Sequence, residues 1–116
     1  DHNRKWRIAE DSGFVAFNMK VDPVLQNTVV LTYWGMDNRG RIFDIYADDV
    51  WIATEDLDKY KASKFYEITY PVDMAITKGK NVVSIKLVPK KNNSAGPVYG
   101  VKMIKGEIGP LINSVK

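Results

Sequence analysis

The chain has 116 residues, 45% of them hydrophobic, which is enough for one domain with its own core. It contains no cysteine, and this excludes disulfides, thiolate metal sites and thiol nucleophiles. The net charge is +3, but only four residues are arginine and the lysines alternate with apolar residues, a pattern that disfavours a surface for reading nucleic acids. No apolar run approaches the roughly 18 residues of a membrane helix. We therefore expect neither a nucleic-acid partner nor membrane insertion.

Apolar and polar residues alternate along most of the chain, as is typical of strands with one buried face. In the first clear segment Val15, Phe17, Met19 and Val21 share one face. Segments of the same kind recur throughout, and the two at residues 6–9 and 50–54 are weaker than the others. The predicted strands, about eight in number, cover residues 6–9, 15–21, 29–33, 43–47, 50–54, 66–70, 83–87 and 99–103.

Turn-forming residues separate these strands. Asp48 and Asp49 lie between two alternating segments, so a tight turn is a better interpretation than a pair of catalytic acids. Residues 92–97 are expected to form a loop, and residues 55–62, which lack an apolar helix face, a loop or a single helical turn. Many short strands divided by turns predict an all-β fold. We expect a two-sheet antiparallel β-sandwich of the jelly-roll, galactose-binding-like type.

Residues 1–116 are expected to form a single domain, with the core within about residues 5–105 and a tail at 106–116. Because the chain begins with Asp1 and shows no signal sequence, we interpret it as a fragment of a larger protein.

Charge is divided between two segments of opposite sign. Residues 44–58 carry six acidic residues and no basic one, whereas residues 74–106 carry seven lysines and no acidic residue. We expect the two segments to lie side by side and to neutralise each other as solvated strand faces.

The sequence offers little for catalysis. The one histidine, His2, lies near the terminus, and no metal-binding motif occurs. Acidic residues lie in loops, where calcium is plausible, but their spacing does not single out a site. We therefore predict no catalytic residue, no metal ligand and no cofactor, and the domain is not expected to be an enzyme.

A candidate ligand site follows the strand at residues 29–33. There two aromatic residues precede a loop rich in hydrogen-bonding groups, a combination suited to sugars, whose C–H faces stack on rings and whose hydroxyls bind polar groups. The alternative is that Trp34 only packs on a sheet face. Trp51 also has two interpretations: it is either an exposed residue that marks an interface or a residue packed beneath a second sheet. The candidate ligand-binding residues are Trp34, Asp37, Asn38, Arg39 and Arg41.

Several short motifs in this sequence resemble those of a known domain family. They include residues 32–35 with Asp37, 40–41 with 43–45, 52–55, 78–80 and 99–101, and they span residue 6 to about residue 104. In these the chain resembles the non-catalytic C-terminal β-sandwich domain of bacterial β-L-arabinofuranosidase-type glycoside hydrolases, often from gut Bacteroidetes. The hairpin at 43–54 more loosely resembles galactose-binding-like jelly rolls, although Asp49 stands where a glycine is usual.

The resemblance implies an accessory domain of a secreted glycoside hydrolase, located in the periplasm or outside the cell. Its partner would be the catalytic domain of the parent protein, against which it packs, with contacts to plant or host glycan in addition. One alternative is a true carbohydrate-binding module that uses Trp34 as an aromatic platform. A second alternative is a protein-interaction module that uses Trp51 and the acidic segment.

Overall fold

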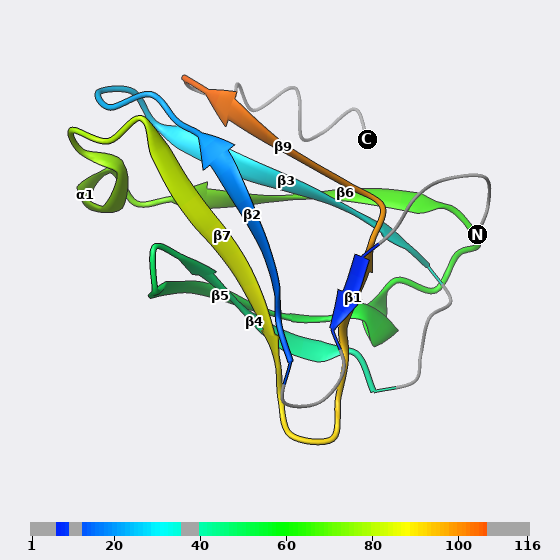
Figure 1. The fold of residues 1–116 in the computed structure, drawn as a ribbon. Coiled ribbons are helices and arrows are strands. Elements are labelled where there is room, and N and C mark those ends of the chain that lie inside the picture. Colours follow the sequence, from blue (N-terminus) through cyan, green and yellow to red (C-terminus); the bar gives the residue numbers. More distant parts are fainter. Residues whose placement is uncertain (1–6, 10–12, 36–39, 107–116) are drawn as a thin grey trace.

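The computed structural model describes residues 7–9, 13–35 and 40–106. Within these ranges nine strands are formed, and most of them belong to two antiparallel sheets (Figure 1). One sheet has four strands in the order β2-β7-β4-β5, and the other has three in the order β6-β3-β9. Strands β1 and β8 form a separate two-stranded ladder. This architecture confirms the predicted β-sandwich.

The elements have the following bounds. The four-stranded sheet consists of β2 (Val15–Lys20), β7 (Val82–Pro89), β4 (Ile42–Ala47) and β5 (Val50–Asp56). The three-stranded sheet consists of β6 (Phe65–Val72), β3 (Asn27–Trp34) and β9 (Gly100–Lys105). The two-stranded ladder pairs β1 (Arg7–Ala9) with β8 (Ala95–Val98). Two short helices complete the described part, the 3-10 helix η1 (Leu57–Lys59) and α1 (Met74–Thr77).

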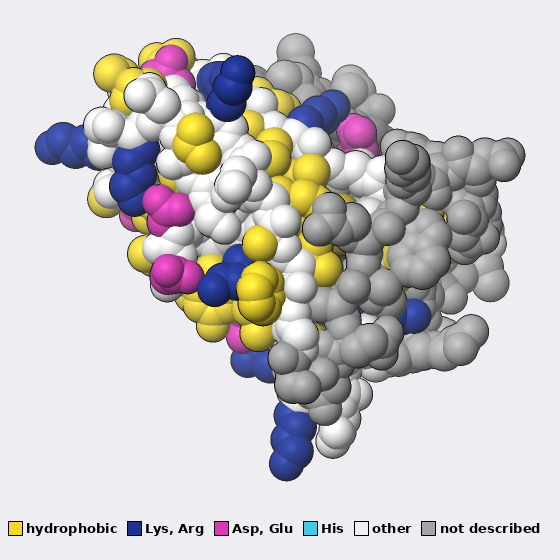
Figure 2. All heavy atoms as spheres, in the orientation of Figure 1, with side chains coloured by type: hydrophobic (Ala, Val, Ile, Leu, Met, Phe, Trp, Pro, Cys, Tyr) yellow, Lys and Arg dark blue, Asp and Glu magenta, His cyan; other side chains and the backbone are white. Residues whose placement is uncertain are grey.

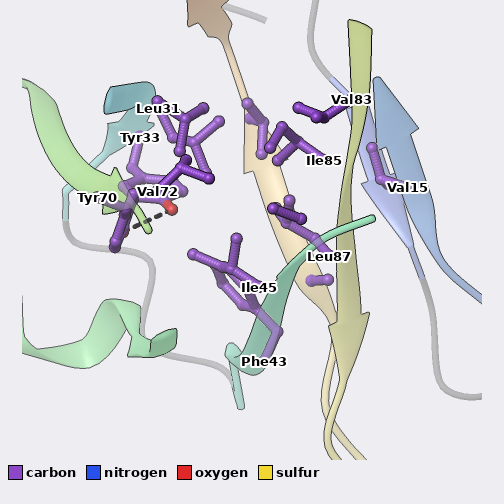
Figure 3. Packing of buried hydrophobic residues seen from close by; sticks show 14 of the residues in the cluster. Val15, Leu31, Tyr33, Phe43, Ile45, Tyr70, Val72, Val83, Ile85 and Leu87 are labelled. Atoms are coloured by element: carbon purple, nitrogen blue, oxygen red, sulfur yellow. Dashed lines mark hydrogen bonds between the residues drawn. The ribbon is translucent and has the colours of Figure 1, made fainter. Parts of the chain in front are cut away.

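The core lies between the two sheets, where alternate residues of each strand point inward (Figure 3). On the four-stranded sheet Phe17 pairs with Ile85, and on the three-stranded sheet Val29 pairs with Tyr70. Burial of these apolar side chains is the main favourable contribution to folding. The largest fully buried hydrophobic side chains are Tyr33, Phe43, Leu31, Ile45, Leu57, Ile85, Leu87, Val29, Val72 and Val83.

The expected opposition of charge is confirmed. Strand β7, from the lysine-rich segment, pairs with β4, from the acidic segment. On the outer surface of this sheet lysines therefore meet aspartates. The ion pairs are Lys80–Asp48 at 2.8 Å, Lys86–Asp49 at 3.1 Å and Lys90–Asp44 at 3.0 Å.

Two expectations about loops have different outcomes. Residues 55 and 56 of the segment at 55–62 are the end of β5, and the remainder contains the single turn of η1, in agreement with the predicted single turn. The loop expected at residues 92–97 is partly wrong, because residues from Ala95 onward form β8. Its Ala-Gly-Pro composition is typical of turns, and its strand conformation depends on pairing with β1, more than 80 residues earlier in the chain. No helix in the described part of the chain is long and apolar enough to cross a membrane.

Candidate functional site

The hairpin between β4 and β5 shapes the candidate site. Its two-residue tip is Asp48-Asp49, with φ of 45° and 67°, which confirms the predicted turn and fits the type I′ geometry of tight hairpins. The Asp48 carboxylate accepts hydrogen bonds from the backbone N–H of Ser84 and from the ammonium group of Lys80, both at 2.8 Å. These two bonds lower the pKa of Asp48, the bond from Lys80 having the larger effect. The tip of the hairpin is thereby tied to the start of β7.

A β-bulge places Trp51 on the outside of the sandwich. Ile45 pairs with Ala53 and Tyr46 pairs with Trp51, so Ile52 is an extra residue in β5. Trp51 therefore shares the outward side of the sheet with Tyr46, and 56% of its surface is exposed. Exposure of this extent is unusual for tryptophan, and it makes Trp51 a candidate for contact with a ligand or a partner.

Hydrogen bonds fix the orientation of the Trp51 ring. Its indole N–H donates to the hydroxyl of Thr54 at 3.0 Å, and that hydroxyl donates to the carboxylate of Asp44 at 2.5 Å. The second oxygen of Asp44 binds Lys90. Partial burial opposes ionisation of Asp44, but the bonds from Thr54 and Lys90 outweigh it and lower the pKa of this carboxyl group. The ring is thus held by its edge in one orientation, a form of preorganisation for binding.

Trp51 forms one wall of a cleft of about 570 Å³ between the β4–β5 hairpin and α1. Asp73 and Lys80 add charged groups to an otherwise mostly apolar lining. Asp73 caps α1 by accepting a hydrogen bond from the N–H of Ala75 at 2.9 Å. The cleft is lined by Val50, Trp51, Ile52, Pro71, Asp73, Ala75, Ile76 and Lys80.

This arrangement suits an amphipathic ligand. An aromatic ring offers its face to C–H groups, and a carboxylate and an ammonium group nearby can bind hydroxyls. The cleft is large enough for a small molecule or for one unit of a longer chain.

The structure places Trp34 in a packed aromatic cluster. The ring is half-buried at the end of β3 and meets Phe65 edge-on, with 4.8 Å between ring centroids, and Phe65 in turn meets Tyr99 at 5.3 Å. The next residue, Gly35, has no room for a side chain, because a Cβ atom would lie 1.9 Å from the carbonyl oxygen of Ala62. Trp34 therefore packs on Phe65, its partner across β3 and β6, and its role as a ligand platform stays a prediction.

Of the other predicted site residues, the structure describes Arg41. Arg41 is half-buried before β4, and its carbonyl oxygen accepts a hydrogen bond from the N–H of Leu57 at 3.1 Å. Asp37, Asn38 and Arg39 lie outside the described residues. Whether these four side chains form one site with Trp34 thus stays a prediction.

A cluster of polar side chains lies inside the core, where it connects the two sheets. The hydroxyl of Tyr70 on β6 donates to the carboxylate of Glu55 on β5, and it lies 2.8 Å from the hydroxyl of Tyr33 on β3 (Figure 3). Glu55 is only 2% exposed and also binds Lys59 at 3.0 Å. Burial is the main cause that raises the pKa of both tyrosines. Because solvent hardly reaches these groups, we interpret them as structural.

No group of three or more His, Asp and Glu side chains within the described ranges is arranged to hold a metal ion.

The comparisons with known proteins agree with the fold. The family model described as "Family of unknown function (DUF6805)" matches residues 1–104, and the chain belongs to this family. A search of curated proteins finds no match. Among solved structures, a family 35 carbohydrate-binding module from an environmental isolate is similar, with a TM-score of 0.57 and 13% sequence identity. The alignment covers 87% of this chain and 74% of that one, so the two share a β-sandwich fold.

Proposed function

We propose that this chain is a non-catalytic carbohydrate-binding domain, and that the cleft beside Trp51 is where it contacts glycan. The observation that carries the proposal is an exposed tryptophan whose ring is fixed by Thr54 and lines a cleft with two charged groups. The fold supports it, because a solved protein of the same architecture is described as a carbohydrate-binding module.

The ligand class follows from the chemistry of the cleft. The face of Trp51 can stack on a pyranose or furanose ring, and Asp73 and Lys80 can accept from and donate to its hydroxyls. Both charged groups already have protein partners, Ala75 and Asp48, which hold them in place before a ligand arrives. Preorganised groups of this kind lower the entropic cost of binding.

We further propose that the domain belongs to a secreted bacterial glycoside hydrolase of the β-L-arabinofuranosidase type. What supports this is the motif resemblance in residues 32–37 and 40–45. On this proposal the chemistry is carried out by the parent protein's catalytic domain, in the periplasm or outside the cell. The domain itself brings no catalytic group and serves to keep that enzyme close to its glycan.

The test is a binding assay on the domain with arabinose- and galactose-containing oligosaccharides, by isothermal titration calorimetry. Trp51→Ala should weaken binding by at least tenfold while the domain stays folded. Phe14→Ala is the matched control, because Phe14 is an equally exposed aromatic residue, 63% accessible, that does not line the cleft. Equal affinities for the wild type and Trp51→Ala would refute the site.

The same assay distinguishes the Trp34 site that the sequence predicts. If Trp34 is the platform, Trp34→Ala abolishes binding and leaves stability unchanged. The packing of Trp34 on Phe65 leads us to expect instead a loss of stability, of about 3 kcal/mol for removal of a large packed ring. Trp34→Ala, measured below its unfolding temperature, should still bind glycan.

A further inference from the structure

The end of the sandwich near α1 carries an exposed apolar patch beside the Trp51 cleft. Val24 and Leu25, in the loop between β2 and β3, are 72% and 48% exposed, and Met74 at the start of α1 is 48% exposed. Hydrophobic side chains gather at this end of the molecule, with basic and acidic side chains beside them, at the upper left of Figure 2. Between the loop and the helix lies a hollow of about 520 Å³, lined by Pro23, Val24, Met74, Ala75, Lys78 and Gly79.

The loop that presents these side chains is held rigidly. The carboxylate of Asp22 accepts hydrogen bonds from the N–H groups of Val24 and Leu25, at 2.8 and 2.9 Å, and these bonds lower its pKa. The fully buried amide of Asn27 binds the backbone of Asp22 and Leu25.

The hollow is fixed from its other side as well, because the N–H of Gly79 donates to the carbonyl of Pro23 at 3.2 Å. These hydrogen bonds hold the backbone that carries the exposed apolar side chains in one arrangement. Preformed docking sites have the same property.

The size of the patch indicates what covers it. Three partly exposed aliphatic side chains amount to on the order of 300 Å², comparable with the largest apolar patch of a typical monomer. Two free proteins need about 800 Å² on each side for a stable complex. Interfaces between domains of one chain begin near 600 Å² in total, about 300 Å² a side, because the linker supplies a high effective concentration.

We propose that this patch docks onto a neighbouring folded domain of the same polypeptide. The surface that fits it is apolar, with an acidic group facing Lys78 at the rim of the hollow. This proposal rests on the accessory-domain part of the proposed function, and it assigns a surface to that role. The docking patch and the glycan cleft lie on either side of α1, since Ala75 lines both, so the docked domain leaves Trp51 beside the junction.

The experiment measures how fast hydrogen peroxide oxidises Met74, by mass spectrometry, in the chain alone and in the whole polypeptide that contains it. We expect oxidation at least fivefold slower in the whole polypeptide. Met103, half-buried in β9, is the internal reference and should react at one rate in both. Val24→Asp in the whole polypeptide should restore fast oxidation of Met74, whereas Phe14→Asp, which adds a charge away from the patch, should not.

Equal Met74 rates in the two proteins would overturn the proposal, as would protection that survives Val24→Asp. Protection that grows with the concentration of the chain alone would assign the patch to a second copy and overturn it too. Glycan affinity of the chain, measured separately, tests the proposed function: absent binding with Met74 protected in the whole polypeptide would refute glycan recognition and leave docking intact.

Discussion

The hydroxyl of Tyr70 donates a hydrogen bond to the buried carboxylate of Glu55, and this bond joins the edge strand of one sheet to the edge strand of the other. Tyr70→Phe leaves that carboxylate and the hydroxyl of Tyr33 without their shared partner. An unsatisfied buried polar group costs about 1–3 kcal/mol, so we expect the free energy of unfolding to fall by that amount. Urea denaturation of the wild type and of Tyr70→Phe measures this difference.

Tyr33→Phe should cost less than Tyr70→Phe, because Tyr70 retains its bond to Glu55 when the Tyr33 hydroxyl is removed. Tyr46→Phe serves as the control, since Tyr46 lies half-buried on the outer side of β4 and should change stability by less than about 0.5 kcal/mol. Equal costs for all three variants would show that the buried network contributes nothing.

Acid should destabilise the domain through Asp48. Its pKa is lowered in the folded state by Lys80 and by the N–H of Ser84, relative to about 3.9 in an unfolded chain. A carboxyl group with a depressed folded pKa contributes stability above the unfolded pKa and loses it as the pH falls through the folded pKa. Stability should therefore decline below about pH 4, and Asp48→Asn should flatten that decline.

Asparagine suits this comparison because it accepts the left-handed conformation at residue 48, where φ is 45°. Urea midpoints between pH 7 and pH 2.5 give the measurement. An unchanged pH slope in Asp48→Asn would mean that Asp48 has the same pKa folded and unfolded.

The second residue of the hairpin tip, Asp49, also has a positive φ, of 67°. A β-branched residue is strained there, so Asp49→Val should lower stability by about 1–2 kcal/mol. Asp49→Gly should be neutral or slightly stabilising, because glycine adopts this conformation freely and the ion pair with Lys86 is exposed. Thermal unfolding of the two variants would contradict the turn assignment if valine were tolerated as well as glycine.

Local patterns predicted most of the sandwich. Alternation placed Tyr33 in the core with Val29 and Leu31, and the contrast between acidic and lysine-rich segments anticipated the pairing of β4 with β7. Alternation succeeds because residues two positions apart on a strand share one face, and the charge contrast succeeds because each segment carries charge of a single sign over many residues.

What sequence could not supply depends on distant contacts. The sequence left Trp51 open between an exposed residue and one beneath a second sheet, and the structure shows it exposed, beside a bulge at Ile52 that alternation does not reveal. Phe65, which packs on Trp34, lies about 30 residues further along the chain, and their meeting requires β3 and β6 to pair. The site predicted around Trp34 and the cleft found beside Trp51 therefore belong to different parts of the surface.

The most direct test of glycan binding at Trp51 is a heteronuclear NMR titration that follows the three indole N–H signals, one for each tryptophan. The indole N–H of Trp51 donates a hydrogen bond to Thr54 in the free domain. Its signal should shift saturably as arabinose- or galactose-containing oligosaccharide is added. Backbone amides at residues 73–76 and 80 should move with it, while the Trp34 signal stays in place. Saturable shifts at Trp34 with none at Trp51, or no shifts at millimolar glycan, would contradict the assignment of the cleft as the glycan site.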